Sequence, residues 1–424
     1  MDCLVIKGGH RLSGTVRVCG AKNAALPIMA ASLLADGPSV IDDLPQLQDI
    51  QSQIELLRLL GAEVNRSADS VSIEVKDPSN SHAPYDVVRK MRASICVLGP
   101  LLARRGVARV SMPGGCAIGD RPVDLHLRGL EALGASVDLE NGDIVARAKR
   151  LRGAAIFLGG NFGSTVLGTA NVMSAATLAK GTTVIESAAC EPEVVDLANY
   201  LRAMGAKITG DGTPRITIEG VDSLHGARHR IIPDRIEAGT FMIAAGITHG
   251  ELQIDNVRID HLMAVVDKLR TVGVLVVESG AGVRVSSQRN LRATSLTTQP
   301  YPGFPTDLQA QFMALLSVAD GNSIITEKIF PDRFMHVAEL SRLGASIHRE
   351  GPTVIVEGPR HLIGAPVMAS DLRASAALVL AGLAAKDTTT VNRVYHIDRG
   401  YEKIEQRLKA VGADIERMDE KELD

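Results

Sequence analysis

The segment ELLRLLGAEVNRSADSVSIEV at residues 55–75 carries the pattern that decides the fold. Apolar residues recur at helical spacing from Leu47 to Leu60, which predicts an amphipathic helix. Gly61 follows at once, and glycine is the usual residue just after the last helical turn because it adopts the left-handed conformation without strain. Two strand-like stretches, 63–65 and 70–75, then flank a short turn. The segment therefore predicts a helix that leads into a β-hairpin.

The apolar-glycine-apolar step of this segment occurs six times along the chain, at intervals of about 70 residues. The six glycines are Gly61, Gly134, Gly205, Gly273, Gly344 and Gly412. A second marker, a turn that leads into a strand, keeps the same period and begins at residues 37, 106, 181, 250, 321 and 387. Two independent markers with one period predict six copies of one helix-strand-helix-strand-strand unit.

The first helix of each predicted unit consists almost entirely of small and apolar residues, which is typical of a buried helix. These helices are predicted at 24–36, 92–104, 166–179, 236–247, 308–318 and 372–385. The second helices are amphipathic, and we expect them to face solvent. The fold class is therefore α/β, with two inside-out α/β domains of three units each, in which sheets surround buried helices.

The predicted domains are residues 21–230 and residues 1–20 with 231–424. Glycines, a proline and charged residues interrupt the pattern near 220–233. The opening segment has no unit of its own, so we expect it to pair as strands with the last units. On architecture alone, a repeat scaffold that only presents a binding surface is also possible.

The composition excludes several classes of protein. The 424 residues include 40 Gly but only 7 Phe, 5 Tyr and no Trp, so aliphatic side chains must fill a large core, and disorder is excluded. A net charge of −3 argues against nucleic-acid binding as the main role. Five widely spaced cysteines without a CxxC pair suggest neither disulfides nor a metal site. With no signal-peptide pattern and no membrane-length apolar run, we expect a cytoplasmic protein.

Polar residues gather just before the buried helices, where helix N-termini offer free N–H groups and a positive dipole end to anions. They are Lys22 and Asn23, Lys90 and Arg92, Arg235 and Glu237, Thr306 and Asp307, and Asp371 and Arg373. Each one alone is also compatible with an ordinary capping or surface residue. Their recurrence at one place in the repeat predicts a polar cleft for small anions.

Four other stretches attract attention. PGGCAIGDRPVDLH at 113–126 predicts a glycine-rich loop on which cations lie near Cys116, a setting that favours a reactive thiolate, although an incidental loop thiol is the alternative. YPGFPTDLQAQ at 301–311 delivers Asp307 to a helix start, and YHIDRGY at 395–401 packs charged residues into a turn. A helix cap and a structural ion pair are the plain alternatives for these two. The glycines of GGNFGS at 159–164 allow close approach to a phosphate or a ring.

Taken together, these motifs resemble the enolpyruvyl transferase family, and within it the members that act on UDP-N-acetylglucosamine. The resemblance runs essentially end to end. It rests on the loop at 113–126 and on GAKNAALP (20–27), MRAS (91–94), EPEVVD (191–196), PDRIEAGTF (233–241), FPTDLQAQF (304–312), DRFMHV (332–337), DLRASAALVLAG (371–382) and YHIDRGYE (395–402). It implies two inside-out domains with the active site in the cleft between them.

The implied reaction is transfer of the enolpyruvyl group of phosphoenolpyruvate to the 3-hydroxyl of UDP-N-acetylglucosamine, with release of phosphate. This is the first committed step of peptidoglycan precursor synthesis, and it needs no cofactor and no metal. Besides these two small-molecule substrates, no nucleic-acid or membrane partner is expected, and the oligomeric state stays open.

The resemblance also assigns residues. Cys116, on the family's mobile loop, is implied as the general acid that also forms an adduct with phosphoenolpyruvate and is the target of fosfomycin. Asp307 is implied as the carboxylate that binds the sugar hydroxyl and takes its proton, with Lys22 and Arg399 completing the catalytic set. The phosphoenolpyruvate-binding residues are Lys22, Asn23, Arg121, Arg373 and Arg399. The UDP-sugar-binding residues are Arg92, Arg121, Pro122, Val123, Asp124, Leu125, His126, Asp307 and Ile329.

Two positions depart from the family pattern. Residue 48 is Gln where members often carry Lys, which removes one charge from the anion site. Residues 159–166 lack the lysine that members often place in the loop near the uridine. Two rivals remain: the shikimate-pathway enolpyruvyl transferase, which shares the fold, and a non-catalytic UDP-sugar sensor. The Cys116 loop argues against the first, and the joint presence of Cys116, Asp307 and Arg399 argues against the second.

Overall fold

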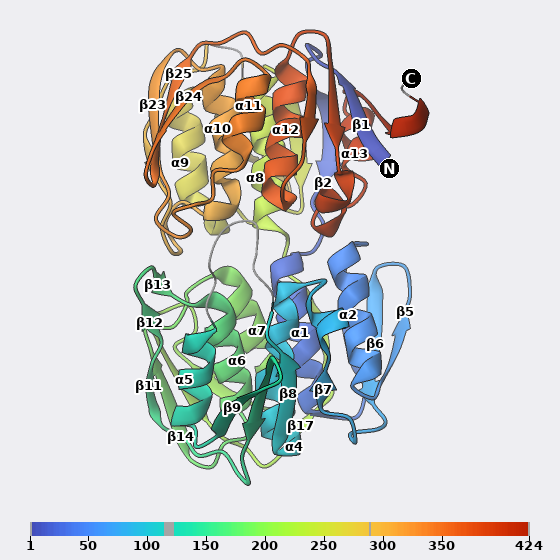
Figure 1. The fold of residues 1–424 in the computed structure, drawn as a ribbon, viewed down its shortest axis with the longest axis vertical. Coiled ribbons are helices and arrows are strands. Elements are labelled where there is room, and N and C mark those ends of the chain that lie inside the picture. The colour runs from blue at the N-terminus through green and yellow to red at the C-terminus, as the bar shows by residue number, and fades with distance from the viewer. Residues whose placement is uncertain (1, 114–122, 288–289, 423–424) are drawn as a thin grey trace. The chain divides into compact units, whose positions relative to one another are not determined.

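The computed structural model describes residues 2–113, 123–287 and 290–422. These residues form two compact units, each with its own hydrophobic core (Figure 1). The central unit consists of residues 20–113 and 123–232, and the terminal unit consists of residues 2–19 and 233–422. The predicted boundaries fall after residues 20 and 230, whereas the structure divides the chain after residues 19 and 232.

The central unit contains helices and strands in a regular order, with 3-10 helices labelled η. They are α1 (Lys22–Ala31), η1 (Ser32–Leu34), β3 (Ala35–Asp36), β4 (Ser39–Asp42), α2 (Gln48–Leu59), β5 (Ala62–Arg66), β6 (Ser70–Val75), β7 (His82–Ala83), α3 (Tyr85–Val88), η2 (Arg92–Val97), α4 (Leu98–Arg105), β8 (Val107–Ser111), α5 (Asp124–Ala132), β9 (Ser136–Glu140), β10 (Asp143–Arg147), β11 (Ala155–Phe157), β12 (Gly159–Gly160), β13 (Gly163–Ser164), α6 (Val166–Ala176), β14 (Thr182–Glu186), α7 (Pro192–Ala203), β15 (Lys207–Thr209), β16 (Arg215–Glu219), β17 (Leu224–His225) and β18 (Arg228–Arg230).

The terminal unit repeats this order with strands from both ends of the chain. Its elements are β1 (Asp2–Lys7), β2 (Ser13–Arg17), α8 (Arg235–Ile247), β19 (Glu251–Asp255), η3 (Ile259–His261), α9 (Met263–Val272), β20 (Leu275–Ser279), β21 (Gly282–Ser286), β22 (Leu296–Thr297), η4 (Thr306–Leu308), α10 (Gln309–Ser317), β23 (Gly321–Thr326), α11 (His336–Arg342), β24 (Ser346–Glu350), β25 (Thr353–Gly358), β26 (Pro366–Met368), α12 (Leu372–Ala384), β27 (Thr388–Asn392), η5 (Val394–Arg399), α13 (Ile404–Ala410), β28 (Asp414–Asp419) and η6 (Glu420–Glu422).

Six four-stranded sheets share one topology, three in each unit. The central unit has the orders β18-β4-β6-β5, β7-β8-β10-β9 and β11-β14-β16-β15, and the terminal unit has β2-β19-β21-β20, β22-β23-β25-β24 and β26-β27-β1-β28. In each sheet the first strand named runs parallel to its neighbour, and the other pairs are antiparallel. Each of the six predicted repeats therefore corresponds to one four-stranded sheet.

The N-terminal segment completes two sheets of the terminal unit. β1 lies between β27 and β28, in register from Asp2 opposite Asp419 to Lys7 opposite Asp414. The sixth repeat ends at β28 without the second strand of its hairpin, and β1 fills that place. Pairing of the N-terminal segment with the last repeat is thus confirmed for β1. β2 instead lies parallel to β19 of the fourth repeat, where it supplies the missing edge strand.

The first helix of each repeat is buried, and in each unit the sheets lie outside the helices (Figure 1). In α8, for example, every residue from Ile236 to Ile247 is buried. This confirms the α/β, inside-out fold class. Two details differ from the predictions. Two of these helices begin as 3-10 turns, η2 before α4 and η4 before α10. The second helices α2 and α7 are mostly buried instead of facing solvent, because both pack against α1.

Among residues 2–113, 123–287 and 290–422, no helix combines the length and the apolar content needed to cross a bilayer.

Candidate active site

Lys22 is the first residue of α1 and is held by a buried carboxylate. Its Nζ atom lies 3.1 Å from Oδ2 of Asp49, and the two side chains are only 9% and 4% exposed. Asp49 is the second residue of α2, so the ion pair joins the starts of two neighbouring helices. A lysine at a helix N-terminus adds its charge to the positive end of the dipole, which suits an anion. Asn23 beside it is half-buried, and Gln48 at the start of α2 is exposed.

The predicted UDP-sugar residues of the central unit lie at the starts of α5 and η2. Val123 is buried and precedes α5, Asp124 is exposed in its first turn, and Leu125 is half-buried. The β12–β13 hairpin packs closely here, because a Cβ atom added to Gly160 would lie 3.1 Å from Cδ1 of Leu125. The glycine-rich stretch therefore borders the start of α5. Arg92 begins η2 and is half-buried.

His126 is buried in the interior of the central unit. Its Nδ1 atom lies 2.9 Å from Nδ2 of Asn171 on α6. The same Nδ2 donates to the carbonyl of Ile95, while Oδ1 of Asn171 accepts from the N–H of Gly99. Since an amide nitrogen can only donate, Nδ1 of His126 accepts, and the neutral ring carries its proton on Nε2. This geometry gives His126 a role in packing α5 against α6.

In the terminal unit, Asp307 lies between two buried arginines. Its Oδ1 is 2.8 Å from Nη1 of Arg333, and its Oδ2 is 2.9 Å from Nη2 of Arg373. The arginine side chains are 6% and 4% exposed, while that of Asp307 is 26% exposed. The fold therefore brings together three residues from η4, from the segment before α11 and from α12.

The charges of the two arginines decide the protonation of Asp307. Burial alone would raise the pKa of this carboxyl, but Arg373 and Arg333 outweigh burial and hold the pKa well below its usual range. Asp307 in turn raises the pKa of Arg373 against the opposing effect of burial. Asp307 and Arg373 are therefore both charged at neutral pH. The accessible part of Asp307 is a carboxylate that can accept a hydrogen bond or a proton.

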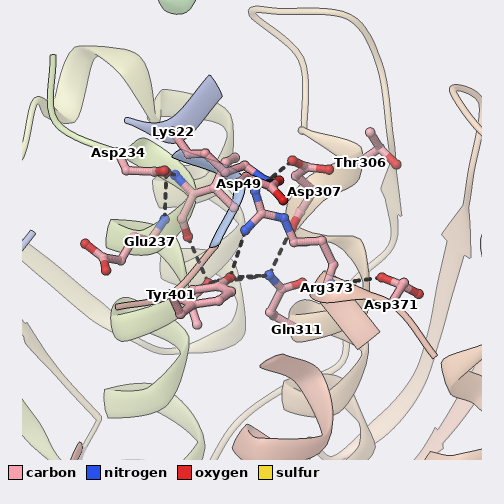
Figure 2. A network of polar contacts seen from close by, with 12 residues as sticks. Lys22, Asp49, Asp234, Glu237, Thr306, Asp307, Gln311, Asp371, Arg373 and Tyr401 are labelled. Atoms are coloured by element: carbon pink, nitrogen blue, oxygen red, sulfur yellow. Dashed lines mark hydrogen bonds and ion pairs between the residues drawn. The ribbon is translucent and has the colours of Figure 1, made fainter. Parts of the chain in front are cut away.

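A second layer of hydrogen bonds orients Arg373 (Figure 2). Asp371 caps α12 by accepting from the backbone N–H of Arg373 at 2.8 Å. Nη1 of Arg373 lies 3.2 Å from the hydroxyl of Tyr401, which is 1% exposed and is also bonded to Gln311 and Thr240. Such a network fixes the guanidinium before any substrate arrives.

The remaining predicted residues lie elsewhere or outside the description. Arg399 is half-buried at the end of η5, which packs against α12. Ile329 lies between β23 and α11, and its backbone N–H donates to Glu327. Cys116, Arg121 and Pro122 lie outside the residues that the structure describes.

Sequence reasoning missed two residues of this site. Arg333 stands in the DRFMHV motif at 332–337, which was noticed without a role for any single residue. Asp49 follows the unusual Gln48, but nothing in its local pattern marks it as the partner of Lys22. In both cases the sequence shows only a charged residue at or before a helix start. That observation does not identify a site residue until the structure shows its ion-pair partner.

Comparison with known proteins places the chain in a family. Residues 6–408 match the family model described as EPSP synthase (3-phosphoshikimate 1-carboxyvinyltransferase). The UDP-N-acetylglucosamine 1-carboxyvinyltransferases of Methylacidiphilum infernorum and Oleidesulfovibrio alaskensis are 56% and 57% identical to it, the first over 99% of both chains and the second over 99% of this chain and 100% of its own.

Solved structures agree on the fold. The enolpyruvyl transferase NikO from Streptomyces tendae is 28% identical with a TM-score of 0.88, covering 98% of this chain and 99% of its own. An EPSP synthase from Acinetobacter baumannii is 18% identical with a TM-score of 0.77, covering 99% of this chain and 100% of its own, and shows the shared fold. These end-to-end matches show that the chain belongs to the UDP-N-acetylglucosamine 1-carboxyvinyltransferase family of enolpyruvyl transferases.

Proposed function

We propose that this protein transfers the enolpyruvyl group of phosphoenolpyruvate to the 3-hydroxyl of UDP-N-acetylglucosamine and releases phosphate, the first committed step of peptidoglycan precursor synthesis. The observation that carries the proposal is the partly exposed Asp307 carboxylate, kept ionised by two buried arginines, in a chain whose curated relatives at 53–57% identity bear this name. The cytoplasm is the proposed compartment, which fits the free thiols of Cys3, Cys19, Cys96 and Cys190.

The proposed reaction has two halves. In the first, the sugar 3-hydroxyl attacks the central carbon of phosphoenolpyruvate, its proton passes to a base, and a proton from an acid reaches the methylene carbon. In the second, the tetrahedral intermediate loses phosphate while the new methyl group gives up a proton, which restores the double bond. We assign the base to Asp307 and the acid to Cys116, and both assignments rest on the family resemblance.

Phosphoenolpyruvate carries a carboxylate and a phosphate, so the reaction needs several fixed cations. We assign Lys22 and Arg121 from the central unit, and Arg373 and Arg399 from the terminal unit, to hold it. The geometry that supports this is the burial of Lys22 and Arg373, each oriented by a carboxylate before substrate binds. Asn23 is proposed to bind where the two substrates meet.

For the UDP-sugar, we assign Arg92, Val123 to Leu125, Ile329 and Asp307, together with Arg121 and Pro122. Leu125 and the neighbouring β12–β13 hairpin form the part of this set whose contact is directly visible. His126 also belongs to this proposed set, and its ring, which is buried against Asn171, supports α5 as well.

The contacts of Asp307 with Arg333 and Arg373, here called the ion triad, also indicate how the base becomes active. While both arginines contact Asp307, its low pKa makes it a weak proton acceptor. Arg373 is also the arginine proposed to bind phosphoenolpyruvate. When the substrate carboxylate binds Arg373, its negative charge lies near Asp307 and offsets part of the guanidinium charge, so the pKa of Asp307 rises. Binding of phosphoenolpyruvate would thereby strengthen the base that acts on the second substrate.

A turnover assay tests this function against its rivals. Phosphate release from phosphoenolpyruvate is measured with UDP-N-acetylglucosamine, with shikimate 3-phosphate and with no acceptor. We expect release only with the UDP-sugar. Release only with shikimate 3-phosphate would reassign the protein to the shikimate pathway. Tight binding of the UDP-sugar without any release would indicate a sensor.

A further inference from the structure

Glu327 is a buried carboxylate next to the candidate site, and the mechanism above gives it no role. Its side chain is 0% exposed and accepts four hydrogen bonds, all from uncharged donors. Oε1 accepts from the hydroxyl of Thr298 at 2.6 Å and from the backbone N–H groups of Ile329 and Phe330 at 2.8 and 3.0 Å. Oε2 accepts from the hydroxyl of Thr306 at 2.9 Å. A buried carboxyl group with four hydrogen bonds is seldom incidental.

The four donors belong to three separate segments, and two of these segments carry site residues. Thr306 directly precedes Asp307, and Ile329 is itself a proposed UDP-sugar residue. Thr298 follows β22, and its hydroxyl also accepts from the N–H of Lys328 at 2.9 Å. One carboxylate therefore ties the start of η4 to the turn after β23.

Glu327 also sets the direction of the hydrogen bonds that lead to Asp307. The Thr306 hydroxyl donates its hydrogen to Oε2 of Glu327. This leaves the Thr306 oxygen free to accept from Nη1 of Arg333, at 3.0 Å. The same Nη1 donates to Oδ1 of Asp307 at 2.8 Å. The orientation of Arg333 thus depends on Glu327 through one hydroxyl group.

We infer that Glu327 is a positioning residue for the enolpyruvyl transfer: it orients Arg333 through Thr306, and so Asp307, and it holds the backbone turn at Ile329. This inference rests on the proposed function for its effect on turnover. The anchoring of the turn at Ile329 by Glu327 does not depend on the proposed function.

The variant Glu327→Gln tests the inference because it keeps the shape and removes the charge. If the amide oxygen faces Thr306, the amide nitrogen faces the N–H groups of Ile329 and Phe330, and donors oppose donors. If the amide nitrogen faces Thr306, it donates to the hydroxyl, whose hydrogen then turns toward Arg333. Each arrangement therefore loses either the hydrogen bonds to Ile329 and Phe330 or the link through Thr306 to Arg333. We expect kcat to fall by about tenfold and KM for UDP-N-acetylglucosamine to rise by about fivefold, with KM for phosphoenolpyruvate changed by less than about twofold.

Two further variants separate positioning from general destabilisation. Asp143→Asn is the matched control: it alters a mostly buried acid in β10 of the central unit that is paired with Arg109. It should lower the melting temperature while leaving kcat and both KM values unchanged. Thr306→Val cuts the link between Glu327 and Arg333. Thr306→Val and Glu327→Gln interrupt the same chain of hydrogen bonds, from Glu327 through Thr306 to Arg333. The kcat of the double variant should therefore be at most about twofold below that of the slower single variant. If the two residues acted independently, the two losses of kcat would multiply instead.

Hydrogen exchange supplies a readout that needs no activity. In the free protein, the amides of Ile329 and Phe330 should exchange faster in Glu327→Leu, whose side chain offers no acceptor, than in the wild type, and at wild-type rates in Asp143→Asn. Unchanged exchange, additive effects on kcat, or a kcat equal to that of Asp143→Asn would each overturn the inference. If Glu327→Gln does not fold, Thr306→Val alone must lower kcat for the inference to stand. A wild type that releases no phosphate would refute the proposed function, while the exchange rates would still decide whether Glu327 holds the turn.

Discussion

The substitution Asp307→Asn perturbs the ion triad with almost no change of shape. The amide oxygen can still accept from one arginine, but the amide nitrogen then faces the other guanidinium, so two donors oppose each other. The arginine left without its carboxylate partner is only 4% or 6% exposed. Breaking a buried ion pair on one side costs about 3–5 kcal/mol, and the 26% exposure of Asp307 puts the present case near the lower end, at about 3 kcal/mol. For a unit of this size we expect a fall in melting temperature of roughly 6–12 °C.

The effect on turnover should be larger than the effect on stability. The amide cannot take the proton of the sugar hydroxyl, and loss of a positioned general base lowers rates by about 10²–10⁴-fold. Binding of UDP-N-acetylglucosamine should survive with a loss of no more than about tenfold, because the amide oxygen still accepts a hydrogen bond. Phosphate release at saturating substrates measures the first quantity, and isothermal titration with the UDP-sugar measures the second. Asp143→Asn again serves as the control for stability alone.

The stability difference between the wild type and Asp307→Asn should depend on pH in one direction. The pKa of Asp307 is depressed in the folded state, so its contribution to stability is fully present above the unfolded pKa of about 3.9 and is lost as the pH falls toward the folded value. The stability difference between wild type and Asp307→Asn should therefore stay constant between about pH 5 and pH 8. Turnover close to that of the wild type would refute the assignment of the base. A stability difference that disappeared within this pH range would refute the account of the ion triad.

Three further predictions concern other parts of the site. Asp49→Asn removes the buried partner of Lys22, and steady-state kinetics should show KM for phosphoenolpyruvate raised by about tenfold; an unchanged KM would mean that Lys22 does not depend on this pair. Burial lowers the pKa of His336 to about 4, so the folded state resists protonation; its contribution to stability is present above the unfolded pKa of about 6.5, and about 2 kcal/mol of it is lost by pH 5. Melting temperatures at pH 7 and pH 5 should differ less in His336→Gln than in the wild type, and an equal drop would contradict this reading. Fosfomycin should alkylate Cys116 with loss of activity, as seen by peptide mass spectrometry, and a Cys116→Ala chain should stay unlabelled; an unmodified Cys116 thiol in the treated wild type would count against its role as the acid.

The repeat pattern made most of the fold predictable. Gly61 and its five equivalents end a helix in each repeat, and the structure gives all six a positive φ between 85° and 108°. What the local pattern could not show is pairing between distant segments. β2 is five residues long, and only its parallel register with β19, more than 230 residues away, gives it a place in a sheet. The burial of α7 was missed for a related reason, since it depends on packing against α1.

The residues of the candidate site also fall into those that the sequence could predict and those that it could not. Asp307 and Arg373 could be predicted because each stands at a helix start inside a long motif. Arg333, Asp49 and Glu327 could not, because their roles come from partners that are distant in sequence or that only a defined backbone brings within reach. His126 shows the opposite case. It lies in a conspicuous motif, yet its ring turns inward to Asn171, because the helical phase of α5 puts residue 126 on the inner side.

The place of β1 between β27 and β28 has a consequence for synthesis on the ribosome. β1 leaves the exit tunnel before the whole central unit, but its partners β27 and β28 are made only after that unit. At roughly 5–20 residues per second, its backbone hydrogen-bonding groups wait on the order of 20 to 80 seconds for their partners. The whole central unit emerges during that time and can fold. The segment of β1 stays unpaired until β27 and β28 are made, and only then can this sheet of the terminal unit close.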